Sequence, residues 1–209
     1  MYNLPYFKEK KSERLLAFMA DHPFVVLSGT SEEGKPVATQ VPVLLDEHNG
    51  RAVLSGHFMR NTDHHKALSS NPNVLVLFTG PHCYVSASWY TNPATASTWN
   101  YMTVQIQGKI EFLGQEELLD ILKRTTEKFE GNSDTPGSFD KLDPEYVDRL
   151  SKAIIGFRIH VDTLEHVFKL SQNRDAASYQ KIIDQLSAGT NDEQEIADQM
   201  RLRQQELFG

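Results

Sequence analysis

Short apolar runs, several of them rich in β-branched residues, predict β-strands in the first half of the chain. The runs cover 24–28, 36–45, 52–56, 73–80 and 99–113, and in the last of them apolar and polar positions alternate. Between the second and third runs, Asn49-Gly50 is the dipeptide most typical of a tight hairpin turn. Hairpins this close in sequence predict an antiparallel barrel rather than a doubly wound sheet.

Apolar residues at helical spacing predict helices between and after these strands. The expected helices cover 12–20, 61–70, 115–131, 178–189 and 192–208, and Asp143-Pro144 opens a short one. Gly189 is the expected end of the fourth helix. Residues 155–161 alternate as a half-buried strand, and the run VFKLS at 167–171 is expected to pair back onto it.

The fold class predicted from this order is mainly β with helices, α+β, with helices on the ends of the barrel. We expect one domain over 1–187 and a tail helix over 188–209. The apolar stripe of the tail helix is thin, so it should cover a dimer edge or lie in solvent. Residues 81–98 mix small polar side chains with Tyr84, Trp89 and Tyr90, and we interpret them as a functional loop.

Charge and length narrow the functional classes. The chain has 209 residues and a net charge of −7, so it is long enough for a real core and acidic enough to disfavour direct DNA binding. The small basic cluster Lys8, Lys10 and Lys11 is expected to be solvated surface. The sequence has no apolar stretch typical of a signal peptide or a membrane span, which favours a cytoplasmic location. The single cysteine, Cys83, is consistent with a reducing compartment.

Common enzyme motifs are absent from the sequence. It contains no GxGxxG after a strand, no GxxxxGK[ST], no HExxH and no GxSxG. Adjacent His64 and His65 would point about 100° apart on a helix, so we expect no metal site. No residue is predicted to be catalytic.

Two segments could instead form a ligand site. In LSGHFMRN at 54–61, a strand ends at a turn that offers Ser55, His57, Arg60 and Asn61 before a helix N-terminus, which suits an anion. A plain strand-to-helix turn explains the same residues. The blocks GPHCYVSASWY at 80–90 and TWNYMTVQIQG at 98–108 suit a flat heteroaromatic ligand, or else an aromatic core. The polar run at 171–174 is equally typical of a turn.

These blocks, in this order, resemble the PaiB-type family of FMN-binding negative transcriptional regulators. The similar blocks are MYNLPYF, VATQVPVLLD, LSGHFMRN, GPHCYVSASWY, TWNYMTVQIQG, AIIGFRI and KLSQNR, which together span roughly residues 1 to 187. The resemblance implies a split β-barrel of the flavin-reductase type and an FMN site at the interface of a homodimer. The chain departs from the family pattern at Gln40, where a histidine is expected, at Phe168, where a tryptophan is expected, and in the run NTDHH at 61–65.

The resemblance also implies site residues. Beside the flavin ring it places Thr39, Gln40, Val41 and Pro42, and at the ribityl phosphate it places Ser55, Gly56, His57, Arg60 and Asn61. The long strand, expected from the partner subunit, would contribute Trp99, Asn100, Tyr101 and Thr103. The pocket would be closed by Lys169, Ser171, Gln172 and Asn173. The main hypothesis is an FMN-binding homodimer whose effect on transcription is indirect. The alternatives are a flavin-dependent NAD(P)H oxidoreductase and, as a third hypothesis, a haem-handling protein.

Overall fold

The structure is a computed structural model that describes residues 1–48, 51–92, 94–131 and 135–209. The turn predicted at Asn49-Gly50 lies outside these residues. The chain forms two compact units: one contains Met1–Phe18, Thr79–Val104 and Glu165–Gly209, and the other contains Met19–Phe78 and Gln105–Leu164. We call the first the helical unit and the second the barrel unit.

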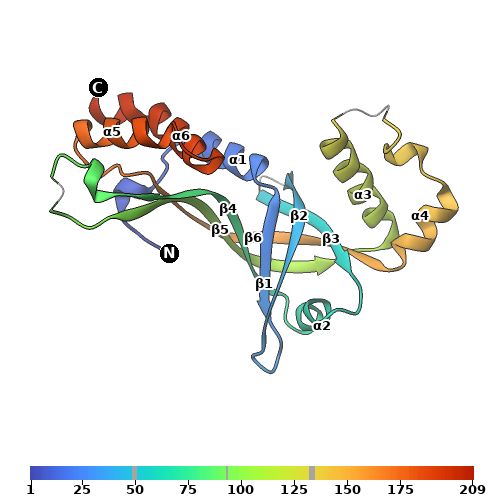
Figure 1. Cartoon of the computed structure of the whole chain (residues 1–209). Coiled ribbons are helices and arrows are strands. Elements are labelled where there is room, and N and C mark those ends of the chain that lie inside the picture. The colour runs from blue at the N-terminus through green and yellow to red at the C-terminus, as the bar shows by residue number, and fades with distance from the viewer. Residues whose placement is uncertain (49–50, 93, 132–134) are drawn as a thin grey trace. The chain divides into compact units, whose positions relative to one another are not determined.

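Six strands close into a barrel in the order β1-β2-β3-β6-β5-β4 (Figure 1). They are β1 Phe24–Thr30, β2 Pro36–His48, β3 Arg51–Met59, β4 Asn73–Val85, β5 Thr98–Phe112 and β6 Ile154–Lys169. The pairs β1–β2, β2–β3, β3–β6 and β1–β4 are antiparallel. The predicted α+β fold with an antiparallel barrel is confirmed.

The barrel unit is filled by the side chains that face inward from these strands. Paired residues share a face of a sheet, so the pairs Leu54 with Ile159 and Gly56 with Phe157 mark the inner face. The inward apolar side chains are at most 4% exposed: Val25, Leu27, Val41, Val43, Leu54, Val76, Phe78, Phe157 and Ile159. These side chains belong to the runs that predicted the strands.

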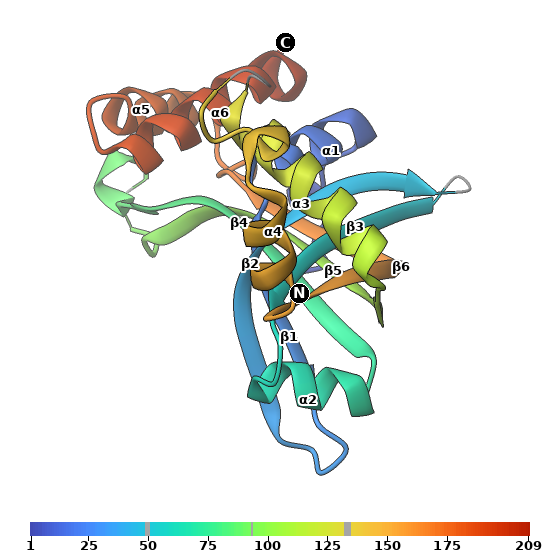
Figure 2. The ribbon, with the colours of Figure 1, turned by 90° about the vertical axis from the view of Figure 1, so that its right-hand side faces the viewer.

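Helices cover the outside of the barrel unit. They are α2 Asp63–Ser70, α3 Gln115–Glu130 and α4 Pro144–Ser151. Helix α2 packs against β1 and β2, and α3 packs against β2 and β3 (Figure 2). Asp143 caps α4 by accepting a hydrogen bond from the backbone N–H of Glu145 at 3.0 Å, as its Asp-Pro start predicted.

The helical unit holds the start of α1 Ser12–Asp21, and α5 Ala176–Leu186 and α6 Asn191–Phe208. Helix α6 is not a solvated tail: Ile196 and Met200 are fully buried, and Tyr179 of α5 donates a hydrogen bond to the Met200 carbonyl at 3.0 Å. The apolar stripe of α6 is narrow, but it is wide enough to pack on one neighbouring helix.

Three predicted boundaries are wrong. Strand β6 runs without a break through 162–165 and ends at Lys169, so the first three residues of VFKLS continue the strand instead of returning along it. Residues 81–85 extend β4 and 87–89 form a short 3-10 helix, which shortens the predicted loop. Helix α5 ends at Leu186, with Ser187 rather than Gly189 at its C-cap. In the part of the chain that is described, no helix is long and apolar enough to cross a membrane.

Candidate functional site

The predicted anion turn lies in the barrel unit, but it begins later than expected: β3 runs on to Met59, so Ser55, Gly56 and His57 lie within the strand, and only Arg60, Asn61 and Thr62 connect it to α2. Asn61 adopts a left-handed backbone with φ of 62°, and its N–H donates to Nδ1 of His65 at 3.0 Å. Thr62 caps α2, because its hydroxyl accepts from the backbone N–H of His65 at 3.3 Å. The backbone N–H of Arg60 donates to the carbonyl of Ala153 at 2.9 Å, which ties the turn to the start of β6.

Part of the predicted flavin-binding set shares the outer face of this sheet. Ser55 pairs with Leu44, and alternate residues of a strand share a face. Gln40 and Pro42 of β2 therefore lie on the same face as Ser55 and His57 of β3. Thr39, Val41 and Gly56 face inward, so only their main chain is available to a ligand on the outer face. Gly56 is needed for packing, since an added Cβ would lie 2.6 Å from the Phe157 ring.

Two polar groups in this region have no partner among the described residues. Nδ1 of His57 is buried without a hydrogen bond, and burial lowers the pKa of this imidazole. The Arg60 guanidinium, half-exposed, forms no hydrogen bond or ion pair with the described part of the chain. A buried polar atom without a partner costs free energy unless a ligand or water satisfies it. The turn therefore has unused capacity to bind a polar ligand.

The turn should be sensitive to acid through His65. Its Nδ1 accepts the Asn61 N–H, so that nitrogen must be unprotonated. Burial lowers the pKa of His65 below its ordinary 6.5, with Arg60 contributing. As the pH falls, the unfolded chain therefore protonates His65 before the folded protein does. The contribution of His65 to the free energy of unfolding is present above about pH 6.5 and is lost below it.

We expect the melting temperature of the wild type to fall between pH 7.5 and 5.5 by more than that of His65→Gln. A glutamine oxygen can accept the same N–H but does not titrate. Part of the fall should remain, because the pKa values of His57 and His166 are also lowered by burial. Equal falls in both proteins, measured by circular dichroism, would show that the His65 contact carries no acid sensitivity.

The other predicted residues lie in the helical unit, where hydrogen bonds link several of them. Ser171, with φ of 62°, donates to Oδ1 of Asn100 at 3.0 Å, and Lys169 donates to the hydroxyl of Thr98. Asn100 is fully buried and also donates to the sulfur of Met200 at 3.6 Å. Its amide is therefore engaged inside the protein, where it anchors the strand.

Gln172 likewise bonds to its own segment. Its side chain accepts from the Leu170 N–H at 2.8 Å and donates to the Phe168 carbonyl at 2.5 Å. Asn173 is exposed, whereas Tyr101 and Thr103 are half-buried. Of the residues predicted to close the pocket, Lys169, Ser171 and Gln172 use side-chain polar atoms for hydrogen bonds within this unit.

Trp99 is different, because it is 53% exposed and lies in an aromatic group. Its ring is 6.0 Å from Tyr84 and 6.1 Å from His82, measured between centroids. Nearby in sequence, the buried hydroxyl of Tyr90 has no partner among the described residues, and the Arg174 guanidinium lies 4.1 Å from the centre of its ring. The aromatic block is thus only partly core, and Trp99 presents its ring to solvent.

The residues of the β3–α2 turn suit a phosphate. A guanidinium, an imidazole nitrogen, a serine hydroxyl and a helix N-terminus are the groups that proteins use for phosphate oxygens. Asp63 in the first turn of α2 opposes a bound anion, but its carboxylate already accepts the backbone N–H of His64 at 2.8 Å. Ser55, His57, Arg60 and Asn61 would hold the phosphate of FMN, and Gln40 and Pro42 would face the rest of the molecule.

The sequence did not reveal a second polar cluster, in the helical unit. Arg203 of α6 is only 6% exposed and donates to a carboxylate oxygen of Glu9 at 2.5 Å. One signal was available, because Arg203 follows Ile196 and Met200 at helical spacing on the buried stripe. A charge on such a stripe needs a buried partner.

Comparisons with known proteins identify the family of the chain. A family model described as "Putative FMN-binding domain" matches residues 1–163. "Protease synthase and sporulation protein PAI 2" of Bacillus subtilis (strain 168) is 36% identical over 200 residues, which cover 96% of this chain and 94% of that protein.

Solved structures share the fold at low sequence identity. The FAD and haem binding protein from Mycobacterium smegmatis has a TM-score of 0.57 and 16% identity, over 77% of this chain and 72% of that one. A conserved hypothetical protein from Mycobacterium tuberculosis has a TM-score of 0.56 and 15% identity, over 81% of this chain and 91% of that one. The family match and the Bacillus relative confirm the PaiB-type resemblance and the cofactor predicted with it: the chain belongs to the family of FMN-binding domains.

Proposed function

We propose that the protein binds FMN with its phosphate at the β3–α2 turn and acts as a homodimer in regulation. The observation that carries the proposal is the buried Nδ1 of His57 near the end of β3, together with the Arg60 guanidinium that follows the strand, both without a hydrogen-bond partner among the described residues. Both belong to the block LSGHFMRN, which lies within residues 1–163, the part of the chain that the family model covers. FMN supplies a redox-active flavin ring when bound. The chain's own residues bind and orient it, and none is assigned to move a proton.

The dimer contact is proposed at the aromatic group around Trp99. An exposed tryptophan beside Tyr84 is typical of a protein interface, where large aromatic side chains are enriched. We assign Trp99 and Tyr101 to this contact, as the family resemblance implies. Trp99→Ser should shift the protein from dimer to monomer in sedimentation equilibrium, whereas Trp89→Ser should leave the dimer intact. A dimer unchanged by Trp99→Ser would refute the assignment.

The regulatory role is proposed to be indirect. The Bacillus relative is named as a protease synthase and sporulation protein, and together with the PaiB-type resemblance this supports a regulatory role for the present chain. A net charge of −7 opposes contact with DNA phosphates, so the effect would pass through a protein partner in the cytoplasm. We expect bound FMN to be reduced by NADH or NADPH no faster than free FMN. Fast bleaching in stopped-flow would favour the oxidoreductase hypothesis instead.

Arg60→Ala should weaken FMN binding by about 10- to 100-fold, because a charge-assisted hydrogen bond contributes about 1.5–3 kcal/mol. Lys66→Ala is the matched control: it removes one positive charge from the exposed side of α2 in the same segment. Fluorescence titration of FMN measures both. If the two variants lose the same affinity, the phosphate lies elsewhere.

A further inference from the structure

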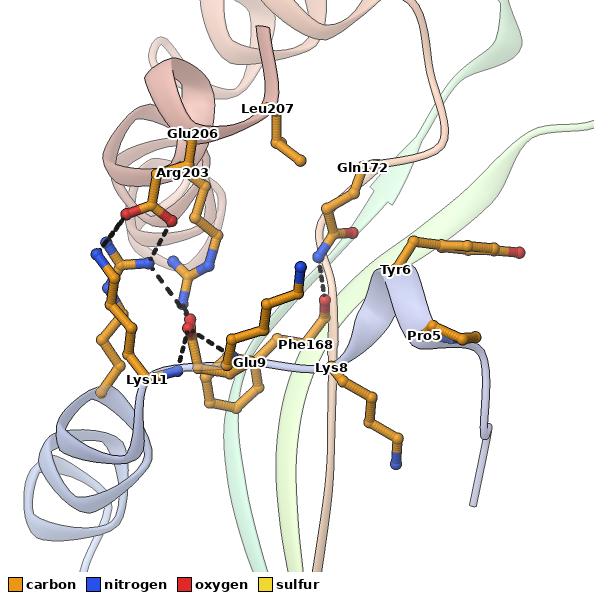
Figure 3. A pocket seen from close by; sticks show the side chains of 12 residues that line it. Pro5, Tyr6, Lys8, Glu9, Lys11, Phe168, Gln172, Arg203, Glu206 and Leu207 are labelled. Carbon is orange, nitrogen blue, oxygen red and sulfur yellow. Dashed lines mark hydrogen bonds and ion pairs between the residues drawn. The ribbon is translucent and has the colours of Figure 1, made fainter. Parts of the chain in front are cut away.

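A cavity of about 440 Å³ lies within the helical unit, away from every residue of the β3–α2 turn in the sequence. Its walls come from the N-terminal segment 5–14, from Phe168 and Gln172, and from α6 (Figure 3). Its volume falls in the range of small-molecule sites, about 300–1,000 Å³. The basic cluster at Lys8, Lys10 and Lys11, expected to be solvated surface, lines this cavity.

The lining is strongly positive on an otherwise acidic protein. It contains five cationic side chains, Lys8, Lys10, Lys11, Arg14 and Arg203, and two carboxylates, Glu9 and Glu206, an excess of three positive charges on a chain of net charge −7. Clefts lined by one sign of charge focus the electric field and concentrate ions of the opposite sign. The cavity therefore attracts anions.

Both carboxylates are already neutralised inside the cluster. Glu9 accepts from Arg203 at 2.5 Å and from the backbone N–H groups of Lys10 and Lys11 at 2.9 and 3.1 Å (Figure 3). Glu206 accepts from Lys11 at 2.6 Å and from Arg14 at 2.8 and 3.0 Å. Neither carboxylate is left over to pair with the remaining cations.

Several donors remain unused. The Lys10 ammonium forms no hydrogen bond or ion pair with any described residue. Lys8 gives one hydrogen bond, to the His166 carbonyl at 3.0 Å. Arg203 makes three hydrogen bonds, two to Gln199 at 2.8 Å and one to Glu9, which leaves two of its five N–H groups. Because the Arg203 side chain is buried, its remaining N–H groups have a fixed orientation and little contact with water.

The cavity also has an apolar side. Phe168 is 1% exposed and lines the cavity together with Tyr6 and Leu207. The Arg203 guanidinium lies 5.5 Å from the centre of the Phe168 ring, which holds the cation against the aromatic wall. A ligand that carries charge at one end and carbon at the other would match such a lining.

We propose that this cavity binds a small phosphate-bearing polyanion. A phosphate group presents several oxygens to donors from different directions, which suits a mixed set of lysine and arginine side chains, and two or more negative charges match the excess of three positive ones. No residue of the proposed FMN turn lines the cavity, and its existence does not depend on that proposal.

Calorimetric titration with inorganic pyrophosphate at low ionic strength tests the site. One pyrophosphate should bind per chain, and Lys10→Gln should weaken binding about tenfold. Lys10 supports no other described residue, so this variant should fold normally. Lys181→Gln, on the exposed side of α5, removes the same charge outside the cavity lining and should bind as the wild type does.

Three results would overturn the proposal. The first is the absence of pyrophosphate binding to a folded wild type. The second is an equal loss of affinity in Lys10→Gln and Lys181→Gln, which would indicate only a general effect of charge. The third is an equal loss of pyrophosphate binding in Arg60→Ala, which would place the pyrophosphate at the β3–α2 turn instead of this cavity. Loss of FMN binding in Arg60→Ala with pyrophosphate binding unchanged would support two separate sites.

Discussion

Replacing Arg203 with methionine is expected to lower the free energy of unfolding by about 3–5 kcal/mol, the typical cost of breaking a buried ion pair from one side. The side chains of Arg203 and Glu9 are 7% and 4% exposed, and 2.5 Å separates their bonded atoms. Methionine keeps most of the volume but leaves the Glu9 carboxylate with Arg14, 3.6 Å away, as its nearest remaining cation. The N-terminal segment would then lose its buried link to α6 and keep only the more exposed bonds of Lys11 and Arg14 to Glu206.

Urea denaturation measures this effect, and Arg201→Met provides a matched control on the same helix. Arg201 pairs with Asp198 at 2.5 Å, but its side chain is 46% exposed, and exposed ion pairs contribute little, about 0–1 kcal/mol. The double variant Glu9→Gln with Arg203→Met should recover part of the loss, because no buried charge is left unpaired. If Arg203→Met costs no more than Arg201→Met, the buried pair does not stabilise the fold.

Gly108→Ala is expected to destabilise the protein by about 3 kcal/mol, near the upper end for an overpacked site. An added Cβ on Gly108 would lie 2.2 Å from the carbonyl oxygen of His160 in the barrel unit. The obstacle is backbone of β6, which cannot rotate away as a side chain can. The two strands would have to separate at this point of the barrel.

The control for this substitution is Gly114→Ala, where no atom lies within 4 Å of the added Cβ. Gly114 is the N-cap of α3, and alanine at such a position should cost about 1 kcal/mol or less. Thermal or urea unfolding compares the two variants. Similar stability losses at both positions would contradict the close approach of β5 and β6 at Gly108.

Local patterns predicted the elements that depend on local physics. The strands β1 and β2 follow from short runs of β-branched residues, and the start of α4 follows from capping by Asp143. The continuous β6 was missed for a physical reason: residues 162–165 are all exposed, so the alternation that identifies a strand vanishes although the strand continues.

Contacts between distant segments could not be predicted in this way. Glu9 and Arg203 are 194 positions apart, and only folding shows that the basic cluster at Lys8–Lys11 faces a cavity. The β3–α2 turn was predictable, because its residues are consecutive in the sequence. The buried, unpartnered state of His57 Nδ1 depends on tertiary packing and was not predictable.

Binding of FMN by the purified wild type tests the account most directly. Titration of FMN with the protein, followed by flavin fluorescence and absorbance, should saturate at one FMN per chain with a dissociation constant far below about 1 mM. The affinity should fall in Arg60→Ala and persist in Lys66→Ala. A folded wild type that shows no change in the flavin spectrum up to about 1 mM FMN would contradict the account.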